Sequence, residues 1–146
     1  MHKLFLFVLL IASISVFSQS QRKIVQWIPL AGWTHPTVKA YIDRESTWHD
    51  EESDYGYGII LLVNPVAAEI DNGFGKKILV KSIARYLVAD CANGVIAPLK
   101  DFYFNGASLP LLTDKPLSAI DYSGKLDIKP ISKKSPIFLA LCPNYI

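Results

Sequence analysis

Three Asn-Gly dipeptides constrain the fold of this chain most strongly, because each one predicts a tight reversal between two extended segments. They occupy residues 72–73, 93–94 and 105–106. Asn-Gly suits the positive φ angles of a type I′ turn, a common connection in β-hairpins. Runs rich in β-branched, aromatic and aliphatic residues flank the dipeptides, at residues 57–63, 78–91 and 95–104. This pattern predicts strands in an antiparallel meander.

Two earlier strands are expected at residues 24–30 and 37–43, with Gly32 and Pro36 as breakers in the connection between them. The strand over 78–91 has apolar residues on both faces. We therefore expect a core on one face and, on the other, a second layer, a curled sheet or a partner subunit. About five to six strands are predicted in all.

The segment SPIFLALCPN at residues 135–144 predicts a short C-terminal helix. Ser135 suits the N-cap and Pro136 the first helical position. Phe138 and Cys142 are four residues apart and so share one helical face. A short C-terminal strand is the alternative. The predicted fold class is α+β, mainly β, with the helix packed on the sheet.

Residues 1–20 have the parts of a secretory signal peptide. His2 and Lys3 are followed by an apolar stretch from Leu4 to Phe17, and small residues allow cleavage after Ser18 or Ser20. A membrane span needs roughly 20 apolar residues, and this run is shorter. We expect residues 21–146 to form a single domain without a transmembrane segment. With no cysteine near the cleavage site for lipid attachment, the protein is expected in the periplasm, secreted or at the cell surface.

Cys91 and Cys142 are the two cysteines of the chain. An even number of cysteines in an exported protein favours a disulfide over a reactive thiol. The pair lacks Cys-x-x-Cys spacing, and with no His-rich segment nearby it falls short of a zinc ligand set. A bridge between these residues would close a loop of about 50 residues and contribute about 4 kcal/mol.

Charge and motifs exclude several classes of function. Removal of residues 1–20 leaves 14 basic against 13 acidic residues, too balanced to predict a nucleic-acid partner. The chain contains no Gly-x-Ser-x-Gly elbow and no phosphate-binding loop. His35 and His49 are too few for a zinc hydrolase. The residues single out no catalytic constellation, and we predict no metal and no cofactor.

Tryptophans supply the candidate interface residues. Trp27 lies within a predicted strand and is assigned to the core, whereas Trp33 and Trp48 lie in predicted loops and are candidates for an interface. The stretch over 43–54, which contains Trp48, carries six acidic residues and is expected to be a solvated loop.

Five short motifs together resemble the surface-adhesin protein E family of exported bacterial proteins. They are an early strand with tryptophan, IVQWIPL; Tyr41-Ile42-Asp43 with Ser46; a long strand from Lys81-Ser82 to Asp90-Cys91; Tyr103-Phe104-Asn105-Gly106; and the terminal Cys142. The resemblance covers nearly the whole mature chain. The strand ending in Asp-Cys and the terminal cysteine are its most specific part.

The resemblance implies an antiparallel sheet with a helix against it, bridged cysteines and no enzyme activity. It also implies binding of host extracellular-matrix or serum proteins, in some members as a homodimer. A periplasmic inhibitor or immunity-type protein that blocks an enzyme is the alternative, with the loop around Trp48 as the inserting segment. A small secreted hydrolase is a third class, and it would require a pocket with converging acidic side chains.

Overall fold

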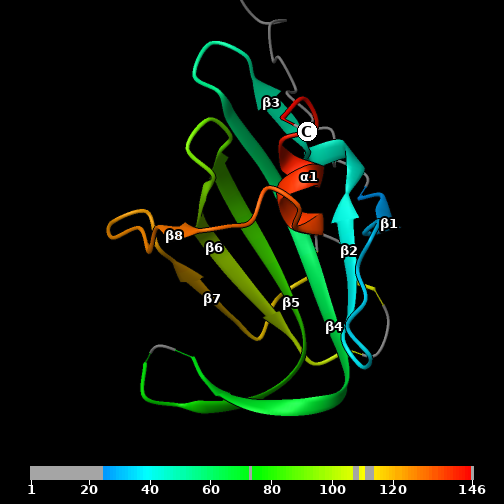
Figure 1. Cartoon of the computed structure of the whole chain (residues 1–146). Coiled ribbons are helices and arrows are strands. Elements are labelled where there is room, and N and C mark those ends of the chain that lie inside the picture. The colour runs from blue at the N-terminus through cyan, green and yellow to red at the C-terminus, as the bar shows by residue number, and fades with distance from the viewer. Residues whose placement is uncertain (1–24, 73, 107–108, 111–113, 146) are drawn as a thin grey trace, which may run out of the picture.

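The computed structural model describes residues 25–72, 74–106, 109–110 and 114–145 of the 146-residue chain. The predicted signal peptide at residues 1–20 lies outside this part. Within it, a strongly curved antiparallel sheet carries one short helix, α1 (Pro136–Leu141), on one face (Figure 1). The predicted class, mainly β with a C-terminal helix, is confirmed.

The strands of the sheet run in the order β1-β2-β4-β5-β6-β7, with β3 added to β4 and β8 to β6. Their bounds are β1 Trp27–Pro29, β2 Lys39–Asp43, β3 Trp48–Asp50, β4 Tyr55–Asp71, β5 Lys77–Asp90, β6 Val95–Phe104, β7 Ser118–Asp121 and β8 Lys129–Pro130. The expectation of five to six strands was too low, since the described residues form eight. The strands missed are β3, β7 and β8, which have four residues or fewer. Such strands depend on hydrogen bonds to a long neighbour and carry little pattern of their own.

The stretch over 43–54 is not the simple loop that its charge predicts. It contains a 3-10 turn at Arg44–Ser46 and strand β3 (Trp48–Asp50), and only residues 51–54 form the turn into β4. Asp43 caps the 3-10 turn by accepting a hydrogen bond from the Glu45 amide. Because β3 pairs with β4, its side chains lie alternately on one face of the sheet and on the other.

Of the three Asn-Gly dipeptides, Asn93-Gly94 lies in the expected tight turn, between β5 and β6. Gly94 has φ +65° and donates its amide to the Asp90 carbonyl over 2.9 Å. Asn72 begins the β4–β5 connection, although Gly73 lies outside the described residues. The prediction at Asn105-Gly106 was wrong, because residues 105–117 separate β6 from β7.

Strand β4 runs without interruption through Pro65, but its register with β5 shifts between Val63 and Ala68. The long β4–β5 hairpin bends there. Its outer part, residues 64–72 and 74–81, extends below the rest of the sheet in the view of Figure 1, and we call it the arm. Val66 and Phe74 of this arm are mostly exposed. Few buried contacts hold the arm, so it is the least stabilised part of the sheet.

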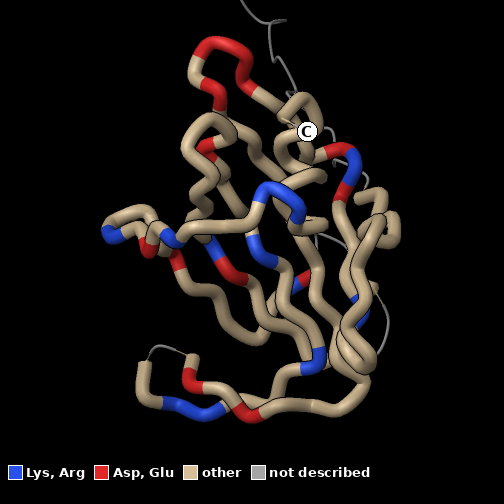
Figure 2. The backbone as a smooth tube through the Cα atoms, in the orientation of Figure 1, with Lys and Arg blue, Asp and Glu red and all other residues tan. Residues whose placement is uncertain are grey.

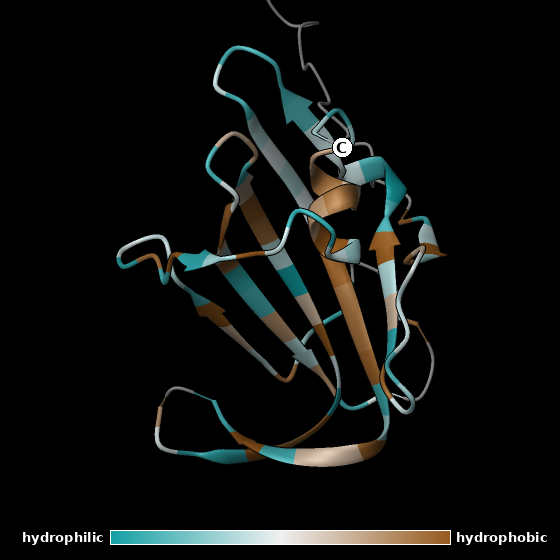
Figure 3. Ribbon diagram, viewed as in Figure 1, coloured by the Kyte–Doolittle hydropathy of each residue, from teal (hydrophilic) through white to brown (hydrophobic). Residues whose placement is uncertain are grey.

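Both faces of the central strands are covered along part of their length, as the two-sided pattern of 78–91 predicts. On the face that carries α1, Leu87 and Ala89 of β5 join a buried cluster with Phe138 and Leu141 of the helix. On the other face, Ala84 lies with Leu61 and Phe104 in a second cluster. Trp27 packs against that second cluster and donates its indole N–H to the Pro110 carbonyl over 2.6 Å. Apolar residues gather along β4 and α1 (Figure 3).

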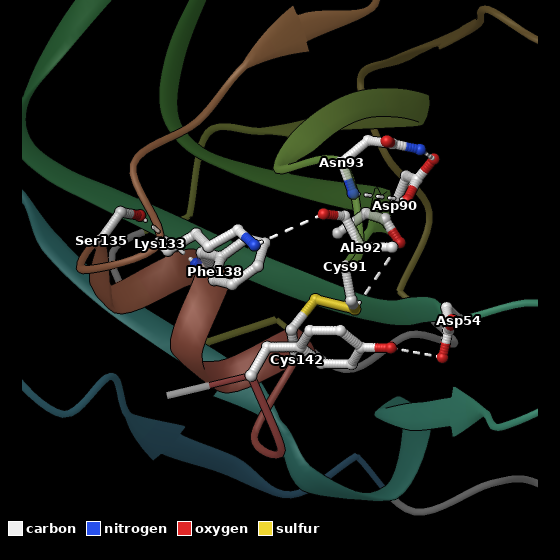
Figure 4. The surroundings of a disulfide bond; sticks show 11 residues. Asp54, Asp90, Cys91, Ala92, Asn93, Lys133, Ser135, Phe138 and Cys142 are labelled. Carbon is white, nitrogen blue, oxygen red and sulfur yellow. Dashed lines mark hydrogen bonds between the residues drawn. A yellow bond between two sulfur atoms is a disulfide. The ribbon is translucent and has the colours of Figure 1, made fainter.

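Helix α1 begins and ends where its sequence predicts. Ser135 is the N-cap and accepts a hydrogen bond from the Phe138 amide over 3.3 Å. The Cys91–Cys142 disulfide is confirmed, with a Cα–Cα distance of 5.6 Å (Figure 4). Both cysteines are fully buried. The bridge fixes the end of the helix to the end of β5.

Two glycines allow α1 to lie directly on strand β4. A Cβ atom on Gly56 would lie 2.1 Å from the Leu141 carbonyl oxygen, and one on Gly58 would lie 2.7 Å from Leu141 Cδ2. At Gly56 the close atom belongs to the backbone of the helix, so only glycine permits this approach. At Gly58 it is the end of the Leu141 side chain, which would have to shift to admit a larger residue. The sequence Tyr55-Gly56-Tyr57-Gly58 thus places its glycines under the helix.

We predict that Cys142→Ser lowers the free energy of unfolding by about 4 kcal/mol, because a loop of 51 residues loses its constraint in the unfolded state. For a domain of this size the melting temperature should fall by roughly 10–20 °C. Calorimetry under oxidising conditions measures the change, with wild type reduced and held in dithiothreitol as the matched control. An unchanged melting temperature would contradict this prediction.

Gly56→Ala should destabilise the fold by about 3 kcal/mol, since its methyl group meets backbone that cannot move without displacing α1. Gly124→Ala is the control, because nothing lies within 4 Å of its Cβ position and its φ is not positive. Urea unfolding of both variants gives the comparison. Equal stability of the two would show that the helix does not depend on this contact.

Candidate binding surface

The tyrosines of Tyr55-Gly56-Tyr57-Gly58 point away from the helix. Successive residues of a strand face opposite sides of the sheet, so glycines beneath α1 place both tyrosines on the far side. No described helix or strand covers this end of the far face. We call it the aromatic face and define it by Trp48, Tyr55, Tyr57 and Val88.

One cross-strand row of the aromatic face contains Trp48, Tyr57, Val88 and Ala97, each paired with the next. The Trp48 and Tyr57 rings are stacked, with centroids 4.3 Å apart and planes at 12°. Trp48 remains 50% exposed. A large ring held in place by a neighbour yet open to solvent is typical of a binding surface.

The adjacent row contains Asp50, Tyr55, Asp90 and Val95, again paired in register. Asp50 accepts a hydrogen bond from the Ser53 hydroxyl over 2.6 Å, which lowers the pKa of its carboxyl group. The Asn93 side chain donates to Asp90 over 2.7 Å and lowers the pKa of that carboxyl. Two ionised carboxylates therefore flank the Tyr55 ring.

The phenol of Tyr57 responds to these surroundings. Burial raises its pKa first, and the negative charge of Asp50 raises it further. The Tyr57 phenol therefore stays neutral at neutral pH, and the negative charge beside the aromatic face comes from Asp50 and Asp90.

A shallow hollow of about 310 Å³ opens on the aromatic face. Its wall is apolar apart from Asp90 and the tyrosine hydroxyls, and its outer rim is formed by the exposed Leu126 and Ile128. The remaining lining residues are Tyr55, Tyr57, Val88, Val95, Ile96, Ala97 and Leu99.

A second hollow, of about 490 Å³, lies on the opposite face between α1 and strands β1 and β2. Its lining is aliphatic with Arg44 and Thr47, and it contains no aromatic side chain. Although larger, it lacks the rigid aromatic groups that anchor protein partners.

The two tryptophans proposed for an interface have different environments. Trp33 packs against the helix-side cluster and donates its indole N–H to the Val38 carbonyl over 2.7 Å. Its ring also lies against that of His35. Trp48 alone of the two belongs to the aromatic face.

An ion pair between the half-buried Arg85 and the buried Asp101 lies on the helix side of β5 and β6. Arg85 donates through Nε and Nη2 to the two carboxylate oxygens of Asp101, each over 2.7 Å. The hydroxyls of Tyr103 and Tyr122 also donate to Asp101, over 3.3 and 3.0 Å. Burial is the main cause that raises the pKa of Tyr103, and the bond to Asp101 raises the pKa of Arg85. The carboxylate is fully buried and satisfied, so this network serves the fold.

The histidines are far from forming a metal site. His35 Nδ1 accepts hydrogen bonds from the Thr37 and Val38 amides, whereas the His49 ring lies against that of Tyr145. Among the described residues, no group of three or more His, Cys, Asp or Glu side chains could hold a metal ion.

Sequence reasoning found Trp48 but missed Tyr55, Tyr57, Asp50 and Asp90 as its neighbours. The alternation of tyrosine and glycine at 55–58 was the available signal. Small residues at every second position indicate a closely covered face, and so the tyrosines lie on the opposite one.

Solved structures of Haemophilus influenzae protein E are similar to this chain. Its crystal form II gives a TM-score of 0.50 at 17% identity, covering 82% of this chain and 88% of that one. A selenomethionine form gives 0.48, and protein E from a non-typeable strain gives 0.41, at 17% and 16% identity; each covers 82% of this chain, and 87% and 86% of its own. No protein-family model and no curated protein sequence matches.

The likeness to crystal form II shows the fold, and the resemblance inferred from the motifs is confirmed at that level. In the described part of the chain, no helix has the length and apolar character needed to cross a membrane.

The two tryptophans should differ in their effect on stability. Trp33→Ala removes a buried contact and an internal hydrogen bond, and should cost about 3 kcal/mol. Trp48→Ala removes one exposed stack, and should cost about 1 kcal/mol. Urea unfolding followed by circular dichroism measures both. A larger loss for Trp48→Ala would make Trp48 a core residue and remove it from the binding surface.

Proposed function

We propose that this chain, which has the fold of protein E, is an exported, non-enzymatic protein that binds a protein partner through its aromatic face. By its resemblance to adhesins, the partner class is host extracellular-matrix or serum proteins. The exposed Trp48–Tyr57 stack beside an open apolar hollow carries this proposal.

Physical reasons favour a protein partner for this surface. Tryptophan and tyrosine dominate the binding energy of protein interfaces because they bury large areas at little conformational cost. Here the two rings are already stacked, so little side-chain entropy is lost on binding. The sheet beneath them is rigid, because Tyr57 and Val88 belong to the central strands.

The sequence supports export independently of the surface. Residues 1–20 read as a signal peptide, and a buried disulfide suits an oxidising compartment. A glycoside hydrolase requires two acidic side chains that converge in one pocket. The described pockets do not bring acidic side chains together in this way, which favours a binding function over a hydrolase.

An inhibitor of an enzyme is the second candidate. The sequence assigned its inserting segment to the loop around Trp48, but Trp48 lies in strand β3 and stacks on Tyr57, so a different feature favours an inhibitor. The β4–β5 arm projects from the sheet (Figure 1), and Phe74 near its tip is 81% exposed. An inhibitor typically inserts such a projecting apolar side chain into an active site. The two candidates therefore predict different binding residues.

Purified protein should bind to at least one immobilised matrix or serum protein from a panel containing fibronectin, laminin, vitronectin and plasminogen. Trp48→Ala should weaken that binding at least tenfold, as truncation of a central aromatic anchor does. Leu79→Ala is the matched control and should bind like wild type, because Leu79 is similarly exposed, at 54%, but lies on the arm. Surface plasmon resonance supplies the affinities.

Phe74→Ala separates the two candidates. If Phe74→Ala loses binding and Trp48→Ala binds like wild type, binding through the aromatic face is contradicted and the inhibitor is favoured. Absence of binding to every member of the panel would contradict the adhesin-type partner class.

A further inference from the structure

We infer that the hollow of the aromatic face receives a lysine or arginine side chain from a basic segment of the partner. This inference rests on the proposed function, because it names the chemistry of the partner that the same surface binds. It depends on the relation between the aromatic rings, the hollow and two carboxylates.

The carboxylates stand on either side of an aromatic ring. Asp50 and Asp90 are both paired in register with Tyr55, from the two strands that flank β4. Neighbouring strands lie about 4.8 Å apart, so the backbones that carry the two aspartates are about 10 Å apart. A cation placed over the Tyr55 ring would therefore lie between two negative charges.

These charges are hydrogen-bonded but not neutralised. Asp50 accepts from Ser53 and the Glu52 amide, and Asp90 accepts from Asn93. Neither forms an ion pair with a basic side chain of the described residues. A cationic partner would supply the charge that is missing.

Two basic side chains near this surface are engaged elsewhere. Lys129 pairs with Asp127 over 2.8 Å, and Lys133 donates to the Ala92 carbonyl in the β5–β6 turn (Figure 4). Both interactions are exposed to solvent, and neither lysine side chain pairs with Asp50 or Asp90.

The hollow suits the stem of such a side chain as well as its charge. Lysine and arginine carry an apolar stem and a charged head, and they favour sites where the stem is buried and the head meets an acceptor. Val88, Leu99 and Leu126 supply an apolar wall, while Asp90 lies on the lining itself. Tyr55 lies on the same lining, and its ring would add cation–π attraction.

Acidic residues beside the hollow extend the negative potential. The turn between β3 and β4 carries Glu51 and Glu52, both exposed, and forms an acidic tip at one end of the molecule (Figure 2). Such a field accelerates the approach of a basic segment and repels an acidic one. A neutral sugar or an apolar ligand would gain nothing from these charges.

Blocked hexa-arginine and hexa-lysine peptides test the inference, with hexa-glutamate as the control probe. Titration into the purified protein should shift the NMR signals of Trp48, Tyr55 and Val88 in a saturable manner. Hexa-glutamate should cause no shift. Affinity should fall at least tenfold in 1 M NaCl, because exposed charge pairs are screened.

Asp50→Asn combined with Asp90→Asn should weaken binding of the basic peptides at least tenfold. Asparagine keeps the shape and an acceptor oxygen at each position, so the turns should remain formed. Glu69→Gln is the matched control and should change affinity less than twofold, because this carboxylate lies on the arm and pairs with Lys77.

Two outcomes of the peptide titrations would overturn the inference: equal affinity of wild type and the double Asn variant, or shifts confined to residues outside the aromatic face. A panel partner that still depends on Trp48 but is unaffected by the double Asn variant would also overturn it, and would leave the proposed function intact. Conversely, if the basic peptides bind at Tyr55 as described but no panel protein binds, the proposed partner class fails and the inference is supported.

Discussion

The close approach of helix α1 to strand β4 is the contact on which the rest of this structure depends. One helix of six residues covers the helix-side core, and a helix this short is unstable alone. It persists because Gly56 admits the helix backbone to close contact with β4 and because Cys142 is bridged to Cys91. Phe138 and Leu141 then complete a buried cluster that the sheet could not close by itself.

The same contact creates the binding surface. Since strand residues alternate, glycines under the helix place Tyr55 and Tyr57 on the opposite face. Strand β3 then adds Trp48 against Tyr57 and Asp50 beside Tyr55. The four-residue segment Tyr55-Gly56-Tyr57-Gly58 therefore serves the core on one side of the sheet and the proposed binding surface on the other. A mutation at Gly56 would be expected to affect both.

Much of the fold could be predicted from sequence because it is encoded locally. The long strands follow from runs of β-formers, the helix from Ser135 and Pro136, and the disulfide from the even number of cysteines in a chain predicted to be exported. Short strands could not be predicted in this way, because β3 and β8 exist only where β4 and β6 offer free backbone groups. The tight turn predicted at Asn105-Gly106 was also wrong, because a dipeptide favours a turn but does not determine which strands pair.

The sequence by itself determined the class of fold, its bridge and the presence of exposed tryptophan candidates, all from properties of neighbouring residues. Only the tertiary structure decided that Trp33 is partly buried against the core while Trp48 stays exposed, although both lie in predicted loops. It also decided that Asp50, Tyr55 and Asp90 share one row. The reason is physical: a row across a sheet joins residues from separate strands, and its members are fixed by register, which depends on the packing of the whole domain.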